Sequence, residues 1–220
     1  MTRPLALLAA LVALAACTTP ATTPASPSEA APADPPPGER IREPGFDAAA
    51  WVAAVRAAGT DGERVELSER LLDAVDWRTA CGEDDPTPDG RGVVRLVHLS
   101  PTESLAEITC QRFAAQSTFA LVDARAGRPP RLIRALGVLE DGGLSADTTA
   151  SFFGVLSHDP STRPSQFDVL TASAGHGGCG TDARYRLLAR GGAAVETVRA
   201  HADCDDPLAP EAWPVVYSAE

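Results

Sequence analysis

Hydrophobic residues recur at helical spacing in the first part of the chain and at the spacing of β-strands further on. Asp47 can cap a helix that ends near Ala58, because its carboxylate accepts from the free N–H groups of a first turn and Gly59 follows as a stop. A second helix is predicted over residues 64–75, where apolar residues recur at helical spacing. Its apolar face consists of Leu67, Leu71, Leu72 and Val75.

After Trp77 the apolar residues come in short runs rich in β-branched and aromatic side chains, separated by Gly, Pro, Asp and Ser. The runs occupy residues 93–97, 119–122, 132–136, 152–156, 167–170, 185–188 and 195–198. Short strands at this spacing predict a mostly β fold, built as an antiparallel meander, sandwich or open barrel, with one or two N-terminal helices. A fold of the α+β class is the alternative.

Residues 1–16 carry the pattern of an export signal. Arg3 supplies a positive charge, and residues 5–16 form an apolar run of about a dozen positions, shorter than the roughly 20 needed to cross a bilayer. The run leads into Leu-Ala-Ala-Cys at residues 14–17, which resembles the lipobox of bacterial lipoproteins. The resemblance implies cleavage before Cys17 and acylation of that residue, and several acyl chains anchor a protein firmly in a membrane. An ordinary secretory signal with a chance cysteine is the alternative.

The residues after the signal divide into a tether and a domain. Thr18 follows the cysteine in place of the aspartate that marks inner-membrane retention in many diderm bacteria, so in such a host we expect the outer membrane, facing the periplasm. Residues 17–45 hold the lipidated cysteine and a Pro-, Ala- and Thr-rich segment with little to bury, which predicts a disordered tether. Residues 46–220 are long enough for a single globular domain with its own core.

The charge of the chain excludes one class of partner. The formal net charge is −11, and removal of residues 1–16, whose one charge is that of Arg3, leaves −12. A protein this acidic repels phosphate backbones, so no nucleic-acid partner is predicted. The membrane is expected as a partner through the lipid anchor alone.

Four cysteines remain once Cys17 is assigned to the lipid. They are Cys81, Cys110, Cys179 and Cys204. In an oxidising envelope an even set predicts two disulfides, and three pairings are formally possible. Local pairing, first with second and third with fourth, is favoured because each pair encloses strand-like segments that can form neighbouring hairpins. A zinc site that uses His176 is the alternative, but the chain has no CxxC motif.

Residues 77–220 carry a series of motifs in a recognisable order. The series is Trp77, Cys81, Cys110 followed by Ala-Ala-Gln, the glycine-rich residues 175–180, Tyr185, Cys204 and Trp213-Pro214. This order resembles the bacterial domain-of-unknown-function family 1176, whose members are exported and carry paired cysteines around strands. The resemblance implies an envelope location and β structure. It supplies no reaction from which site residues can be carried over.

The search for catalytic groups predicts none. Ser173 and His176 offer a hydroxyl and an imidazole, but no Gly-x-Ser-x-Gly elbow is present to aim them. The glycines of residues 175–180 lack the Lys-Ser/Thr continuation of a phosphate-binding loop. The favoured interpretation of this segment is a tight hairpin turn with a disulfide at its base.

Two acidic turns, each beside a cysteine, provide calcium candidates. The candidates are Asp84, Asp85, Asp205 and Asp206. Calcium takes several oxygen ligands from flexible loops, so the two turns can form a site if the fold brings them together. Asp-Pro turns on a solvated face account for the same residues, and we therefore predict no metal and no other cofactor.

These observations favour a cell-envelope lipoprotein without enzymatic activity that binds a protein, a glycan or another envelope component, or maintains the envelope. One concrete form is a lysozyme-inhibitor-like role, since residues 180–185 resemble a loop of such inhibitors without its serine–glycine pair. The alternative is an envelope hydrolase that acts on peptidoglycan or another secreted polymer. Two inward-facing carboxylates, or a triad of Ser173, His176 and an aspartate, favour the hydrolase, whereas an exposed apolar patch favours binding.

Overall fold

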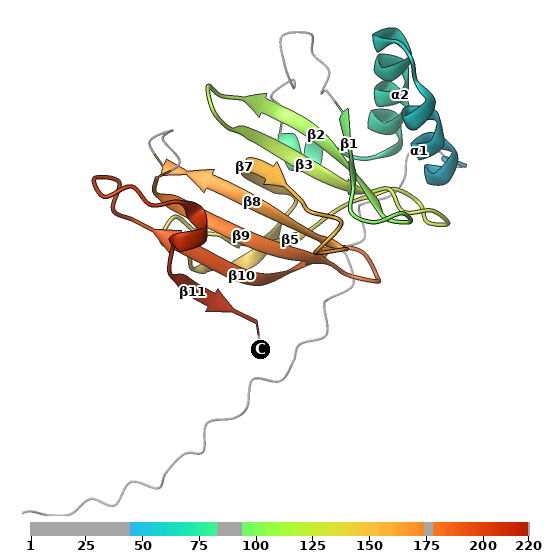
Figure 1. Cartoon of the computed structure of the whole chain (residues 1–220). Coiled ribbons are helices and arrows are strands. Elements are labelled where there is room, and N and C mark those ends of the chain that lie inside the picture. The colour runs from blue at the N-terminus through green and yellow to red at the C-terminus, as the bar shows by residue number, and fades with distance from the viewer. Residues whose placement is uncertain (1–44, 83–93, 174–177, 220) are drawn as a thin grey trace, which may run out of the picture. The chain divides into compact units, whose positions relative to one another are not determined.

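The computed structural model describes residues 45–82, 94–173 and 178–219 (Figure 1). The helices are α1 (Ala48–Ala57), α2 (Asp61–Ala74) and α3 (Arg78–Cys81), with a 3₁₀ turn, η2 (Pro210–Ala212), before the last strand. The strands are β1 (Val94–His98), β2 (Ser104–Arg112), β3 (Ser117–Asp123), β4 (Arg131–Leu132), β5 (Ala135–Val138), β6 (Leu144–Thr149), β7 (Ser151–Ser157), β8 (Gln166–Ala172), β9 (Gly180–Leu187), β10 (Ala193–His201) and β11 (Val215–Ser218). The protein is mostly β with helices on the N-terminal side, which confirms the predicted fold class.

The two longer helices begin where the sequence offers capping groups. Asp47 accepts two backbone hydrogen bonds from the first turn of α1, at 2.9 and 3.1 Å, as predicted. Thr60 and Glu63 form a capping box, so α2 begins earlier than predicted. The Trp51 indole N–H joins the helices by donating to the Leu67 carbonyl at 2.7 Å. Within the described residues, no helix combines the length and hydropathy of a membrane span.

Nine strands form one antiparallel sheet in the order β1–β2–β3–β7–β8–β9–β10–β11, with β4 paired to β3, while β5 and β6 form a separate hairpin. Each predicted run overlaps a strand, and residues 132–136 are divided between β4 and β5. The prediction missed β2, β6 and β11. In β2, polar residues interrupt the apolar ones, and Glu107 is buried there because Arg95 of β1 donates to its carboxylate at 2.7 Å.

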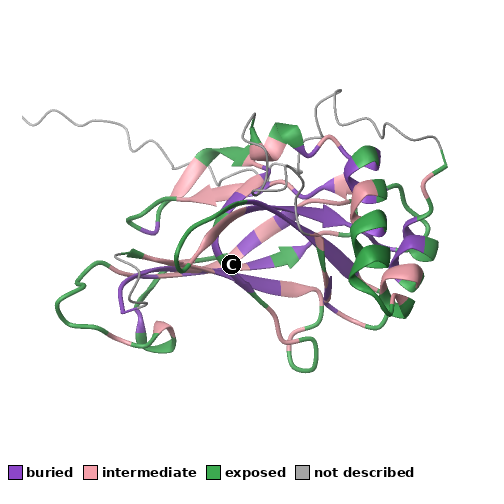
Figure 2. Ribbon diagram, turned by 90° about the horizontal axis from the view of Figure 1, so that it is seen from above, coloured by how far each residue is buried: buried purple, intermediate pink, exposed green. Residues whose placement is uncertain are grey.

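The sheet separates two hydrophobic clusters. The helix-side cluster lies between the helices and β1–β3 and includes Trp51, Leu71, Trp77, Ile108 and Val122. The inner cluster lies on the opposite face and includes Phe119, Phe152, Phe167, Tyr185 and Val198. Residues of β2 and β3 belong to both clusters in alternation, so these strands are buried on both faces, whereas the helices keep an exposed outer side (Figure 2).

Residues 131–135 enclose the inner cluster by linking two strands that are distant in the sheet order. The Ile133 N–H donates to the Leu121 carbonyl of β3 at 2.7 Å, and the Ala193 N–H of β10 donates to the Arg134 carbonyl at 2.9 Å. The path from β3 through β7, β8 and β9 to β10 therefore curves around the inner cluster, and residues 131–135 connect its two ends. Of the three predicted sheet arrangements, this one corresponds to an open barrel.

A buried ion pair holds the same link at the end of β3. Arg125 donates to both carboxylate oxygens of Asp123, at 2.9 and 2.6 Å, and to the Leu188 carbonyl at 2.8 Å. Glu103, which accepts from the Ser165 hydroxyl, lies 3.5 Å from the Arg125 guanidinium. The Asp123 and Arg125 side chains are 2 % and 10 % exposed. The hydrogen bonds to Asp123 raise the pKa of Arg125 despite burial.

Two disulfides pair the cysteines locally, with Cα–Cα distances of 5.1 Å for Cys81–Cys110 and 5.0 Å for Cys179–Cys204. The second closes the β9–β10 hairpin at its base, as predicted. The first pairing is also as predicted, but it does not enclose a hairpin, because Cys81 ends α3 and the bond joins a helix to β2. Each bond restricts the unfolded chain and stabilises the fold by about 3–4 kcal/mol on the loop-entropy account.

Asp123→Asn is expected to destabilise the domain by about 3–5 kcal/mol, because it leaves the buried Arg125 charge without its principal partner. Urea unfolding followed by circular dichroism measures this loss. Asp147→Asn is the control, since Asp147 is exposed on β6. Equal stability of the two variants would contradict the role given to the ion pair.

A candidate ligand pocket on the inner face of the sheet

A pocket of about 330 Å³ opens between the β5–β6 hairpin and the inner face of β7, β8 and β9. This volume falls at the lower end of the range of small-molecule sites, roughly 300–1,000 Å³. Ala183 of β9 lines the pocket with a small side chain. Thr181 and Tyr185 flank it on the same face, since alternate residues of a strand point to the same side. Val169 is the directly opposite residue of β8.

Aromatic rings of the inner cluster form one wall of the pocket. Tyr185 stacks on Phe167 with ring centroids 5.2 Å apart, and Phe152 meets Tyr185 edge-on at 5.6 Å. Phe152 also stacks on Phe119 at 5.7 Å. Tyr185 and Phe152 line the pocket themselves. These contacts fix the Tyr185 ring, so its hydroxyl has a defined position.

Two hydroxyl groups of the pocket wall have no hydrogen-bond partner in the described part of the chain, although neither oxygen is cut off from solvent. Tyr185 is 3 % exposed and Thr181 is 5 % exposed, and neither side chain makes a hydrogen bond within the described part of the chain. Thr171, opposite Thr181, instead donates to the Phe153 carbonyl at 2.7 Å. Water or a ligand in the pocket can therefore bond to these two hydroxyls.

The Tyr185 hydroxyl keeps its proton. Burial raises the pKa of Tyr185 to about 12, because the apolar surroundings disfavour the phenolate. At neutral pH the group is therefore a neutral phenol that can donate one hydrogen bond and accept others.

Glycines allow the strands beside the pocket to approach closely. A Cβ at Gly154 would lie 2.4 Å from the Leu170 carbonyl oxygen, and one at Gly180 would lie 2.0 Å from that of Thr171. Both glycines have a φ of +137°, which other residues rarely adopt. The local path of β7 and β9 at this end of the pocket thus depends on residues without side chains.

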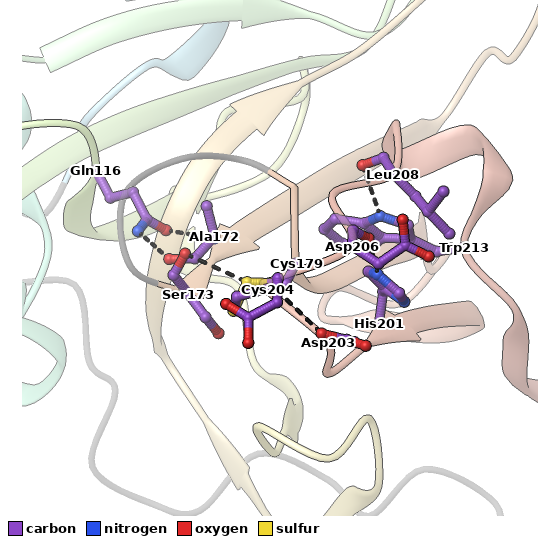
Figure 3. The surroundings of a disulfide bond; sticks show 11 residues. Gln116, Ala172, Ser173, Cys179, His201, Asp203, Cys204, Asp206, Leu208 and Trp213 are labelled. Atoms are coloured by element: carbon purple, nitrogen blue, oxygen red, sulfur yellow. Dashed lines mark hydrogen bonds between the residues drawn. A yellow bond between two sulfur atoms is a disulfide. The ribbon is translucent and has the colours of Figure 1, made fainter.

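The rim of the pocket is held by a side-chain amide and a disulfide (Figure 3). Gln116 donates to the Ala172 carbonyl at 2.6 Å and accepts from the Ala172 N–H at 2.9 Å, as a neighbouring strand would. The Cys179–Cys204 bond lies directly before Gly180, a lining residue. The Leu208 N–H donates to the Gly178 carbonyl at 3.1 Å, and the Trp213 indole donates to the Leu208 carbonyl at 3.0 Å. Residues after β10 therefore pack on the start of β9.

The described part of the pocket wall carries little charge. Glu140 is the one charged residue among the described residues that line the pocket, and Glu140 is exposed. No three His, Cys, Asp or Glu side chains of residues 45–82, 94–173 and 178–219 come together as a possible metal site. The arrangement thus fits an uncharged ligand.

The structure describes only some of the predicted site residues. Cys17, Asp84, Asp85 and His176 lie outside the described residues. Ser173 is exposed after the end of β8, where it lines the pocket. Asp205 donates its backbone N–H to the Asp203 carboxylate at 3.0 Å, and the Asp206 carbonyl lies 2.8 Å from Nε2 of His201, so both aspartates belong to a local turn. The calcium and Ser173–His176 alternatives, which the sequence did not favour, are therefore not tested.

A pair of carboxylates exists on the outer face of the sheet, opposite to the pocket. Asp168 contacts Arg163 at 2.7 Å and Arg184 at 2.9 Å. The pKa of Asp182 is raised, first by burial and then by the charge of Asp168. Alternation along β8 and β9 puts both carboxylates on the side away from Phe167. They therefore do not form the inward-facing pair that a hydrolase would use.

An exposed aromatic pair lies at the turn between β2 and β3 and on β7. Phe113 is 50 % exposed and Phe153 is 42 % exposed, and their rings meet edge-on with centroids 5.7 Å apart. Val155, two residues further along β7, is 46 % exposed. An exposed apolar patch of this kind is the feature that favours binding over hydrolysis.

The pocket residues were not predicted from the sequence. Residues 180–185, read as loop-like, form the first part of β9. A signal was nevertheless present, because Thr181, Ala183 and Tyr185 alternate along one face beside Leu187. A hydroxyl residue in phase with buried apolar residues marks a polar group on an inner face.

Comparison with known proteins adds no assignment. No protein-family model, no curated protein and no solved structure matches this chain. The resemblance to family 1176 stays a prediction, and the pocket is the basis of the function proposed below.

Proposed function

We propose that this protein is a lipid-anchored protein of the bacterial cell envelope that binds a small, uncharged ligand in the pocket on the inner face of its sheet. The observation that carries the proposal is a pocket of about 330 Å³ whose wall includes Thr181 and Tyr185, two hydroxyl residues on the inner face of β9 that have no hydrogen-bond partner in the described part of the protein. Each hydroxyl can donate and accept, so both are available to a molecule bound in the pocket.

Binding without chemistry suits this wall better than hydrolysis does. A hydrolase needs a nucleophile or two carboxylates that converge on the substrate. Among the described residues of the pocket wall, Glu140 is the one carboxylate, and the Ser173 hydroxyl has no histidine beside it in that wall. The carboxylates of Asp168 and Asp182 face away from the pocket and contact or neighbour arginines.

The envelope location is supported by the N-terminal pattern and the cysteines. Residues 14–17 resemble a lipobox, and the two disulfides suit an oxidising compartment. The anchor would hold the domain at the membrane by a tether of residues 17–45. A binding protein at this place takes up its ligand from the compartment outside the cytoplasm.

Ala183→Leu is expected to fill the pocket and abolish the binding of a small apolar probe. Ethylbenzene should raise the melting temperature of the unmodified protein, because a ligand that binds only the folded state stabilises it. It should do the same for Ala194→Leu, whose site faces away from the pocket on β10, opposite Arg186. The same shift in Ala183→Leu as in Ala194→Leu would place the probe elsewhere and refute the proposal.

Cys17→Ser is expected to move the protein from the membrane fraction to the soluble periplasmic fraction. The intact mass of the membrane-extracted protein should match a chain that begins at an acylated Cys17. Thr23→Ser, a change within the tether, should leave fractionation and acylation unaltered. A membrane-extracted mass without acyl groups would contradict the lipid anchor.

A further inference from the structure

We infer that the Tyr185 hydroxyl is the hydrogen-bond donor that selects the ligand, and that the ligand is a small, uncharged molecule with one oxygen acceptor, such as a ketone or an ether. The inference rests on the proposed binding function and adds the chemical class of the ligand. It is carried by the position of a fixed phenol in the wall of a cavity that apolar and hydroxyl-bearing residues line together.

The Tyr185 ring is held firmly, so its hydroxyl can discriminate between ligands. Phe167 stacks on one side of the ring and Phe152 packs edge-on against it, at 5.2 and 5.6 Å between centroids. A donor that is already ordered loses little freedom when it binds. Tyr185 is only 3 % exposed, so a ligand that reaches its hydroxyl also leaves water. A hydrogen bond in such surroundings distinguishes ligands by whether they carry an acceptor.

Apolar and hydroxyl-bearing residues both line the pocket with Tyr185. Val138, Phe152, Val169 and Ala183 are apolar, and Thr149, Ser151, Thr171, Ser173 and Thr181 carry hydroxyls. The Thr171 hydroxyl is engaged by the Phe153 carbonyl, whereas the Thr181 hydroxyl has no hydrogen-bond partner in the described part of the chain. Thr181 is four positions away from Tyr185 on the same face of β9. The Cα atoms of the two residues are therefore about 13 Å apart along the strand. One of them therefore contacts the polar end of a small ligand while Ala183 faces its apolar body.

The charge and the volume of the pocket limit the class of ligand. Among the described residues of the lining none is cationic, so they offer an anionic ligand no counter-charge, and the exposed carboxylate of Glu140 would repel such a ligand. The volume of about 330 Å³ accommodates a molecule on the order of ten non-hydrogen atoms, taking about 30 Å³ for each, the share of a water molecule in the liquid. Single-ring ketones and ethers have this size.

A matched pair of probes tests the inference. Acetophenone and ethylbenzene have nearly the same shape and number of non-hydrogen atoms, and differ in that only the ketone carries an acceptor. Dissociation constants are measured for both by NMR titration with the full mature protein, with Tyr185→Phe, and with Tyr217→Phe as control. Tyr217 is the other tyrosine of the chain, half-buried on β11 and outside the pocket wall.

We expect acetophenone to bind about three- to tenfold more tightly than ethylbenzene, the usual range for one hydrogen bond. The preference should vanish in Tyr185→Phe and persist in Tyr217→Phe. Without ligand, Tyr185→Phe should melt at the same temperature as the unmodified protein or higher, because it removes a hydroxyl that has no partner in the fold. A merely structural role of the hydroxyl would instead lower the melting temperature.

Other outcomes overturn the inference in distinguishable ways. Equal affinity for both probes in the unmodified protein would refute the selecting donor and leave the binding function intact. A preference that survives in Tyr185→Phe but disappears in Thr181→Val would transfer the role to Thr181 and refute the assignment to Tyr185. Failure of both probes to bind would refute the binding function as well.

Discussion

Asp123 and Arg125 stand at the corner where β3 leads to β4, and the contact of Arg125 with the Leu188 carbonyl joins that corner to the β9–β10 hairpin. An antiparallel sheet with an apolar inner face needs a cover for that face. By joining β3 to β10 through residues 131–135, the chain brings the β5–β6 hairpin over the inner face of β7, β8 and β9. The pocket is the space that this cover does not fill, so its existence depends on the closure.

The composition of the pocket wall does not maximise the stability of the fold. A small residue, Ala183, stands where a larger one would fill the space, and Thr181 and Tyr185 are hydroxyl residues on an apolar face. Departures from good packing and complete hydrogen bonding are typical of functional sites, where they cost stability and are retained for binding. By contrast, the buried charges of Asp123 and Arg125 satisfy each other, as structural ionic groups do.

Most of the features that could be predicted from the sequence depend on local signals. The cap at Asp47, the strand runs and the local disulfides all depend on neighbouring residues. The strand β2 was missed because Glu107 is buried only by virtue of Arg95 on another strand, and no local pattern carries that pairing. The same holds for the pocket. Thr181 and Tyr185 are in phase along β9, but only the distant β5–β6 hairpin makes their face a cavity wall.

The most direct test of the account is to locate the probe on the protein. In a sample with labelled Ala and Val methyl groups, ethylbenzene should give intermolecular nuclear Overhauser effects to Val138, Val169 and Ala183, which line the pocket. It should give none to the exposed Val155, Val215 and Val216. Effects confined to these exposed valines would show that the probe binds the outer surface, and would contradict the claim that the inner face of this sheet is a ligand site.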